Sequence, residues 1–287
     1  MSLTHTVILG ALAGFTIYLG LPVGRLALLS NRGRVALAMF SVGVLAFIFL
    51  DVLSNGLHII NSALDAVKQH QGSVGHLVLL VVLLAAGFAA GSAGLAMIER
   101  AMRPLGARKP PIAGGAVSEA LTGAEAASLA SERDAARRRA LRTGLTIAAA
   151  IGVHNFAEGL AIGVSARAGA ISLATVLIIG FALHNATEGF GIVGPLGDVK
   201  PSWRWLGLAG LIGGGPTFVG SMVGFGVTSH PLELAFYAVA GGAILYVIGE
   251  VWTGVRRYGY RELGLLMVTA GFLVGVMTDL LVTYGGA

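Results

Sequence analysis

Apolar residues run in eight long blocks along the chain, and each block holds roughly 20 residues, enough to cross a bilayer as an α-helix. Short polar or charged breaks, such as Asn31 to Arg34 and Arg256 to Arg257, separate the blocks. The predicted spans are about residues 5–29, 35–60, 75–99, 141–166, 170–192, 203–228, 232–254 and 262–284. The pattern therefore predicts an all-α integral membrane protein with eight transmembrane helices in a single transmembrane domain, residues 1–287.

The composition agrees with this class and limits the chemistry. With 55% hydrophobic and 11% charged residues, 287 residues have too little polar surface for a soluble globule. Glycine is frequent, at 44 residues, and we expect small residues four apart to let helices pack closely. These pairs are Gly10/Gly14, Gly87/Gly91, Gly159/Gly163 and Gly220/Gly224. Because the chain has no cysteine, any bound metal must use nitrogen and oxygen ligands.

The basic residues are distributed unevenly between the two sides of the predicted bundle. Of 19 Lys and Arg, only Lys68 and Arg167 fall in the loops after even-numbered spans, and the other 17 lie in or beside the loops after odd-numbered spans. The positive-inside rule then predicts cytoplasmic odd-numbered loops and both termini outside. Aromatic residues at the predicted cytoplasmic boundaries indicate an interfacial belt: Trp203, Trp205, Trp252, Tyr258 and Tyr260. The net charge of +5 thus reflects topology and not nucleic-acid binding.

One connection is long, at about residues 100–140, and mixes Pro, Gly, Ala, Ser and charge. We expect a cytoplasmic loop that is partly disordered. Its basic run, Arg133 to Arg139, fixes the orientation and contacts anionic lipid in the simplest interpretation, while a regulatory or partner-binding role stays open.

A polar pattern occurs twice inside two neighbouring apolar blocks. His154-Asn155-Phe156-Ala157-Glu158-Gly159 lies in the fourth predicted span, and His184-Asn185-Ala186-Thr187-Glu188-Gly189 lies in the fifth. On a helix the histidine and the glutamate of each set share a face, because they are four residues apart. The two spans run in opposite directions, so the two sets are expected to face each other near the bilayer centre.

Two carboxylates at that depth need a compensating partner, because each costs about 2.5 to 3.5 kcal/mol on insertion scales. A single buried His or Glu could instead form an interhelical hydrogen bond or a proton relay. The repetition of the whole pattern favours a metal cation, held by His154, Asn155, Glu158, His184, Asn185 and Glu188. Such a mixed N/O set suits zinc, iron, manganese, cobalt or cadmium. Whether Gly159 and Gly189 serve close packing or metal access stays open.

The function that follows is transmembrane transport of a divalent transition metal, with the metal as substrate and not as a catalytic cofactor. The alternative from another class is an intramembrane metal-dependent hydrolase. Zinc hydrolases of the zincin type carry H-E-x-x-H, whereas here Asn follows His, so we expect no enzyme. A proton-relay or structural membrane protein would need no metal at all. The expected partners are divalent metal ions and membrane lipids, and a homodimer stays open.

The two motifs resemble those of the ZIP family of divalent-metal transporters, whose bacterial members read H-N-F-P-E-G and H-N-x-P-E-G at these places. The resemblance implies a 3+2+3 helix arrangement with inverted outer triplets, a binuclear centre between spans four and five, and zinc movement into the cytoplasm across the inner membrane of a prokaryote. Carried over by position, His154, Glu158 and Glu188 match the ligands of one metal. The ligands of the second metal are matched by Asn155, Glu158, Asn185 and Glu188. His184 is the first residue of the second motif, a position at which family members vary.

The chain departs from the family pattern in two places. Both motif prolines are missing, replaced by Ala157 and Thr187, which should leave straighter helices. Many members also carry a glutamate before a proline in the sixth span, where this chain has Gly215 before Pro216. If Gly215 occupies that place, the second metal loses a carboxylate.

A few further polar residues lie near the ends of predicted spans. Asp51 and Asp279 lie near the outer side, and Glu99 and Glu250 near the inner side. We expect Asp51 to guide the cation in and Glu250 to guide it out, although interfacial acids that cap helices fit equally well. His58, near the outer end of the second span, could be an early metal contact, and Glu99 is expected to pair with its neighbour Arg100.

Overall fold

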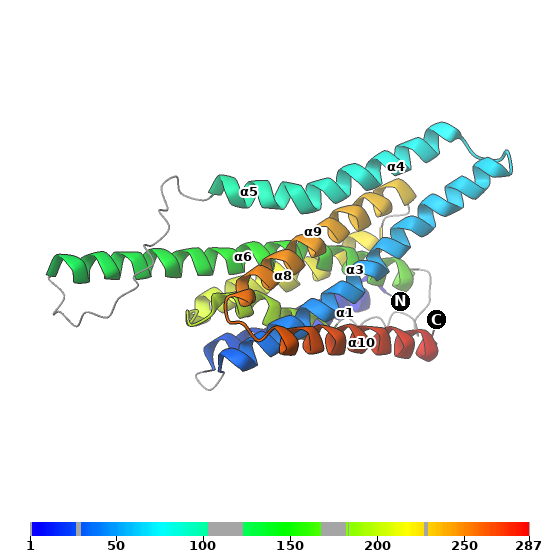
Figure 1. The fold of residues 1–287 in the computed structure, drawn as a ribbon. Helices are drawn as coiled ribbons and strands as arrows, with labels where there is room; N and C mark the ends of the chain where they lie inside the picture. Colours follow the sequence, from blue (N-terminus) through cyan, green and yellow to red (C-terminus); the bar gives the residue numbers. More distant parts are fainter. Residues whose placement is uncertain are drawn as a thin grey trace.

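The computed structural model describes residues 2–26, 30–102, 123–167, 182, 184–226 and 229–286, and within these ranges every regular element is helical (Figure 1). The elements are α1 (Leu3–Phe15), α2 (Ile17–Gly20), the 3₁₀ helix η1 (Leu21–Arg25), α3 (Asn31–Lys68), α4 (Val74–Ala89), the π-helical turn η2 (Ala90–Gly94), α5 (Leu95–Met102), α6 (Gly123–Arg167), a helical stretch at 184–193, the 3₁₀ turn η3 (Gly194–Leu196), α8 (Trp203–Gly224), α9 (His230–Arg256) and α10 (Arg261–Gly286). The predicted all-α class is confirmed.

Among the described residues, seven helical segments are long and apolar enough to cross a membrane. They are Leu3–Arg25, Asn31–Lys68, Val74–Ala101, Leu129–Val164, Trp203–Gly224, His230–Arg256 and Arg261–Leu281. These segments correspond to predicted spans one to four and six to eight. Most of the predicted fifth span, 170–192, lies outside the described residues, apart from the helical residues that include the second motif.

Local sequence explains where several of these helices begin. Ser30 Oγ accepts a hydrogen bond from the backbone N–H of Gly33 at 3.2 Å, and Ser202 Oγ accepts one from Trp205 at 3.1 Å. A serine side chain in this position satisfies a backbone donor that the first turn of a helix leaves free. The polar breaks between the apolar blocks therefore act as helix caps for α3 and α8.

α6 begins at Gly123, inside the range 100–140 that the sequence assigns to a loop. The residues before the apolar part of α6 are rich in alanine, glutamate and arginine, which are strong helix formers. The helix of the fourth span therefore extends past the other helices at the end of the bundle opposite the two chain termini (Figure 1). Residues 103–122 of the expected loop lie outside the described part of the chain.

The helices pack in two groups, and small residues lie at the contacts between the helices of each group. In the first group, α8 packs along α6 and α1: a Cβ at Gly14 would lie against the carbonyl oxygen of Gly214, and one at Gly159 would lie against that of Thr217. In the second group, α3 packs on α10 and α9, and α4 and η2 pack on α9, where Gly91 of η2 meets the backbone of Val239. The glycine pairs chosen from the sequence therefore lie at helix contacts.

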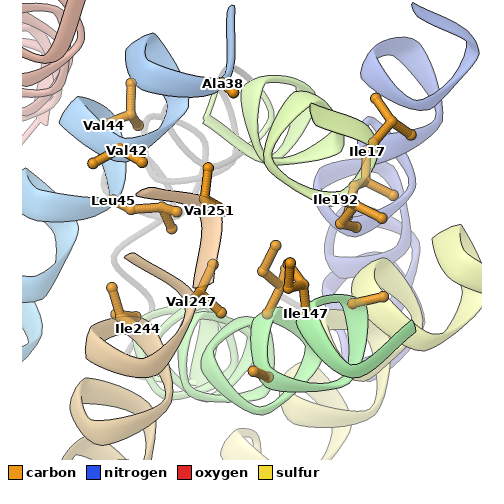
Figure 2. Close-up of a cluster of buried hydrophobic side chains, with 14 of the residues drawn as sticks. Ile17, Ala38, Val42, Val44, Leu45, Ile147, Ile192, Ile244, Val247 and Val251 are labelled. Atoms are coloured by element: carbon orange, nitrogen blue, oxygen red, sulfur yellow. The ribbon is translucent and has the colours of Figure 1, made fainter. Parts of the chain in front are cut away.

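A hydrophobic core joins the two groups. Figure 2 shows side chains from both groups meeting in one cluster, all of them buried. The labelled members come from α2, α3, α6, the 184–193 stretch and α9: Ile17, Ala38, Val42, Val44, Leu45, Ile147, Ile192, Ile244, Val247 and Val251. The apolar core therefore lies on both sides of the two motif-bearing helices and holds them in place.

The close packing around α8 predicts that adding a methyl group at one of its contact glycines lowers the stability of the protein. A Cβ at Gly220 of α8 would lie against the carbonyl oxygen of Phe156 and 3.1 Å from Cα of Gly159. Gly220→Ala should therefore lower the thermal unfolding temperature. The expected loss of unfolding free energy from overpacking is about 1–3 kcal/mol. Gly207→Ala on the same helix is the matched control, because a Cβ there meets nothing within 4 Å. Equal unfolding temperatures for the two variants in detergent would contradict the packing account.

Candidate metal centre

The first motif lies on α6, which places its polar side chains inside the bundle. His154 and Asn155 have no exposed surface, and Glu158 is 5% exposed. His154 and Glu158 are one helical turn apart on the same face, and Nε2 of His154 lies 2.9 Å from Oε1 of Glu158, outside hydrogen-bond geometry. α6 passes through Ala157 without a break, as the loss of the motif proline predicts.

The second motif lies on the helical residues 184–193 and meets the first. Nε2 of His184 lies 2.5 Å from Oε1 of Glu158, the same oxygen that His154 approaches. Oε1 of Glu188 lies 3.8 Å from Nε2 of His154, and both Asn185 and Glu188 have no exposed surface. At the position of the second missing proline, the hydroxyl of Thr187 donates to the carbonyl of His184 at 2.7 Å.

Three of these side chains could hold one metal ion. One donor atom each from His154, Glu158 and His184 lie within 4.8 Å of one another. The ligands of a zinc ion stand about 2 Å from the metal, so donor atoms on a shared ion are separated by up to about 4 Å. Small side-chain rotations would bring the three atoms to that spacing, with neutral imidazoles and an ionised carboxylate as the binding forms.

The two asparagines are anchored through their amide nitrogens. Nδ2 of Asn155 donates to Oε2 of Glu188 at 3.2 Å and to the carbonyl of Gly213 on α8 at 3.0 Å. Nδ2 of Asn185 donates to the carbonyl of Ala13 on α1 at 3.0 Å. Each asparagine therefore ties a motif helix to a neighbouring helix and leaves its amide oxygen free to face the site.

Several oxygens in this cluster are buried without a hydrogen-bond partner. They are the two amide oxygens, Oδ1 of Asn155 and Oδ1 of Asn185, together with Oε2 of Glu158 and Oε1 of Glu188. Buried acceptors are nearly always satisfied in folded proteins, and leaving one unsatisfied costs about 1–3 kcal/mol. Carboxylate and amide oxygens are ligands for divalent cations, so bound cations would supply the partners that these atoms lack.

The glycine before Pro216 does not face the site. A Cβ at Gly215 would meet only the side chain of Leu211 on the same helix, at 3.5 Å. The part of α8 that contacts the motif residues is the carbonyl of Gly213. An added Cβ at Gly215 therefore contacts α8 itself and no motif residue, and whether the second metal loses a carboxylate at this position stays a prediction.

The motif glycines Gly159 and Gly189 both lie at helix contacts. Gly159 meets Thr217 and Gly220 of α8, and Gly189 meets Ile17 and Gly20 at the end of α2. A side chain at either position would push a neighbouring helix off a motif-bearing helix. The structure therefore assigns both glycines to close packing, one of the two roles that the sequence left open.

The outer residues chosen from the sequence differ in their relation to the site. Asp51 on α3 is exposed, and its Oδ1 accepts a hydrogen bond from Nδ2 of Asn55 at 3.3 Å. The carboxylate is within electrostatic range of Glu158, His154 and His184. His58, two helical turns further along α3, is exposed, and its carbonyl accepts a hydrogen bond from Ser62.

Among the inner residues, Glu99 has a different partner from the one that the sequence suggested. Glu99 is 8% exposed, and its Oε2 accepts a hydrogen bond from the hydroxyl of Tyr246 on α9 at 3.0 Å. Arg100 is exposed and makes no ion pair with Glu99, so the expected local pair is wrong. Glu250 is half-buried one turn beyond Tyr246 on the same helix, which places two carboxylates along one side of α9.

Sequence reasoning missed three contributors to this region: the carbonyls of Gly213 and Ala13, and the side chain of Tyr246. Backbone carbonyls leave no signal in residue identity, so only the helix packing could reveal them. Tyr246 lies in an apolar run where a core tyrosine would look the same. Together the observations define a class: an all-helical integral membrane protein with a buried, acid-rich polar centre between two of its helices.

Comparison with known proteins finds similarity over the part of the chain that carries both motifs. Residues 113–248, which include both motifs and the packing partner α8, match the family model described as "ZIP Zinc transporter". A stretch of 150 residues is 29% identical to "Zinc transporter ZupT" of Clostridium perfringens (strain 13 / Type A), and it covers 49% of this chain and 51% of that relative. The chain thus spans about half the length of the curated relative that it matches. The region that carries both motifs is therefore similar to ZIP transporters, in agreement with the resemblance of the two motifs.

Proposed function

We propose that the chain carries divalent transition-metal cations, zinc foremost, across the membrane through a site between α6 and the helical residues 184–193. The single observation that carries this proposal is Oε1 of Glu158, which is buried between the imidazoles of His154 and His184 at 2.9 and 2.5 Å. Iron, manganese, cobalt and cadmium fit the same donor types. The relative from Clostridium perfringens is described as a zinc transporter, which supports zinc as the first metal to test.

The donor atoms divide into two sets. His154, Glu158 and His184 supply two nitrogens and an oxygen for one cation. The amide oxygens of Asn155 and Asn185 and the free oxygen of Glu188 supply a second, oxygen-only set beside it. The proposed first set contains His184, which the family resemblance leaves unassigned. The second set is a harder and weaker site, because it lacks imidazole.

The proposed topology has eight spans, arranged 3+2+3 with inverted outer triplets, with both termini outside and the connection after α5 in the cytoplasm. Two observations support it. The described chain ends lie at the same end of the bundle (Figure 1), which requires an even number of crossings, whereas seven segments are described. The eighth crossing in this proposal is the span that the sequence predicts at 170–192, and the basic residues of the sequence fall mainly in the loops expected at the opposite end.

The proposed route runs from Asp51, through the buried centre, to Glu250 and Glu99 at the inner side. Asp51 attracts a cation to the centre because its carboxylate is in electrostatic range of Glu158. Tyr246 holds Glu99 beside α9, one turn from Glu250, so the inner carboxylates form a path along that helix. An inside-negative potential drives a dication inward by about 4.6 kcal/mol per 100 mV, twice the value for one unit charge.

The direct test is uptake of radioactive zinc, iron, manganese and cadmium into proteoliposomes, with protein-free liposomes as the baseline. We expect zinc uptake that rises when an inside-negative potential is imposed. Uptake equal to that of protein-free liposomes for every metal, from correctly folded protein, would contradict the proposed transport.

The route makes a separate prediction about the two end carboxylates. Asp51→Asn and Glu250→Gln should each slow zinc uptake several-fold while leaving equilibrium zinc binding at the buried centre within about twofold, because neither residue is a proposed ligand there. Asp65→Asn is the matched control on α3, since Asp65 is exposed and pairs with its neighbour Lys68 at 3.1 Å. Loss of binding in step with uptake would contradict the assignment to the route.

A further inference from the structure

A cavity of about 530 Å³ lies where the start of α3, the end of α9 and the start of α10 meet. These helix ends lie at the end of the bundle opposite the chain termini (Figure 1). The lining residues are Val35, Met39, Trp252, Val255, Arg256, Gly259, Tyr260, Arg261, Gly264 and Leu265. None of them belongs to the proposed transport route.

The lining divides into an apolar floor and an amphipathic rim. Val35, Met39 and Val255 are each at most 3% exposed and form the floor. Trp252 and Tyr260 are 41% and 44% exposed and stand at the rim. Aromatic side chains of this kind prefer the boundary between hydrocarbon and water. The cavity is therefore open to the region where lipid headgroups meet acyl chains.

Two arginines at the rim are free to bind an anion. Arg256 and Arg261 are exposed, and no carboxylate pairs with either of them among the residues that the structure describes. By contrast, the neighbouring Arg257 donates to the hydroxyl of Tyr258 at 3.1 Å and to the carbonyl of Pro195. The two free guanidinium groups give the rim a concentrated positive charge.

The turn between α9 and α10 keeps the two arginines on the same cavity. Gly259 and Tyr260 have φ values of 79° and 47°, in the left-handed region. A non-glycine residue in that region costs about 1 kcal/mol or more, so Tyr260 is held there by its surroundings. This tight reversal places Arg261 at the start of α10 opposite Arg256 at the end of α9.

We propose that this cavity binds an anionic phospholipid, with the phosphate between Arg256 and Arg261 and the upper part of an acyl chain on the floor formed by Val35, Met39 and Val255. Guanidinium groups bind phosphate through paired hydrogen bonds. The apolar floor and the boundary aromatics select a lipid over a soluble phosphate, which would leave the floor exposed to water. The bound lipid links α3, α9 and α10, the helices of the second packing group.

The test measures binding of fluorescent phosphatidylglycerol to the purified full-length protein in a non-ionic detergent. The competitors are unlabelled phosphatidylglycerol, phosphatidylcholine and glycerol phosphate. We expect displacement by phosphatidylglycerol only. Equal displacement by phosphatidylcholine would overturn the charge argument, and equal displacement by glycerol phosphate would overturn the role of the apolar floor.

Two double variants locate the site. Arg256→Gln/Arg261→Gln should weaken phosphatidylglycerol binding about 30-fold, since each basic residue near an anionic lipid contributes about fivefold. Arg100→Gln/Arg204→Gln is the matched control, because both residues are exposed at the same end of the bundle and outside the cavity. An equal loss of phosphatidylglycerol affinity in the two double variants would show that general surface charge accounts for the binding, and would overturn the proposal.

A second measurement covers the case in which the double variant does not fold. Phosphatidylglycerol with brominated acyl chains should quench the fluorescence of Trp252, because its ring lines the cavity. The measurement uses Trp203→Phe/Trp205→Phe protein, in which Trp252 is the remaining tryptophan of the three. Quenching no stronger than with brominated phosphatidylcholine would overturn the proposal, whatever the result for zinc transport.

Discussion

Glu158→Gln is expected to reduce zinc uptake into proteoliposomes by about 100-fold or more. Its Oε1 is the one atom that both motif histidines approach, so the substitution removes the only carboxylate of the first donor set. Changes in residues that merely support a metal ligand cost about 10- to 100-fold in affinity, and loss of a charged ligand should reach at least the upper end of that range. The measurement is the initial rate of uptake at a fixed zinc concentration.

The Glu158→Gln protein should fold normally. Reduced zinc uptake would then reflect loss of the metal site and not failure to fold. Glutamine has the shape of glutamate and carries no charge, so its burial is less costly than that of the carboxylate in the absence of metal. We expect an unfolding temperature without zinc that is equal to or above that of the wild type. Glu262→Gln, at an exposed position in the first turn of α10, is the control and should transport at the wild-type rate. Wild-type uptake by the Glu158→Gln protein would remove Glu158 from the route.

His184→Ala is expected to weaken zinc binding by about 100-fold while manganese binding falls by less than about tenfold. The imidazole of His184 lies 2.5 Å from Glu158 and completes the nitrogen-rich donor set. Imidazole ligands favour zinc, whereas carboxylate and carbonyl oxygens suffice for manganese. The change should therefore appear as a shift in the zinc-to-manganese ratio, measured by competition titration of the purified protein.

This result separates the proposed donor set from a set that omits His184. If His184 only supports Glu158 by a hydrogen bond, both metals should weaken by the same factor. His76→Ala is the control, because His76 is exposed in the first turn of α4 and far from the motifs in sequence. Equal losses of zinc and manganese in the His184→Ala protein would contradict a direct role of the imidazole.

Much of this arrangement could be predicted from residue spacing. A separation of four residues places His154 and Glu158 on one helix face, and the repeat in the next predicted span suggested that the two sets would face each other. The glycine spacings likewise predicted close helix packing, and Gly10, Gly14, Gly159 and Gly220 do lie at contacts of α8 with α1 and α6. These features are local periodicities, so they can be read without knowledge of the fold.

Other features depend on three-dimensional packing and could not be predicted in this way. The anchors of Asn155 and Asn185 are backbone carbonyls of α8 and α1, and any residue type would supply them. The contact that a Cβ at Gly215 would make with Leu211 likewise follows only from the packing. Glu99 has a basic neighbour in sequence, yet it turns to Tyr246, which lies 147 residues further along the chain.

The account rests on a cation between the two motifs, and anomalous X-ray diffraction at the zinc edge tests that claim most directly. Crystals grown with zinc should show a peak about 2 Å from Nε2 of His154, Oε1 of Glu158 and Nε2 of His184, and crystals of the Glu158→Gln protein should show a much weaker one. Wild-type crystals with zinc elsewhere but no peak at these three atoms would contradict the account.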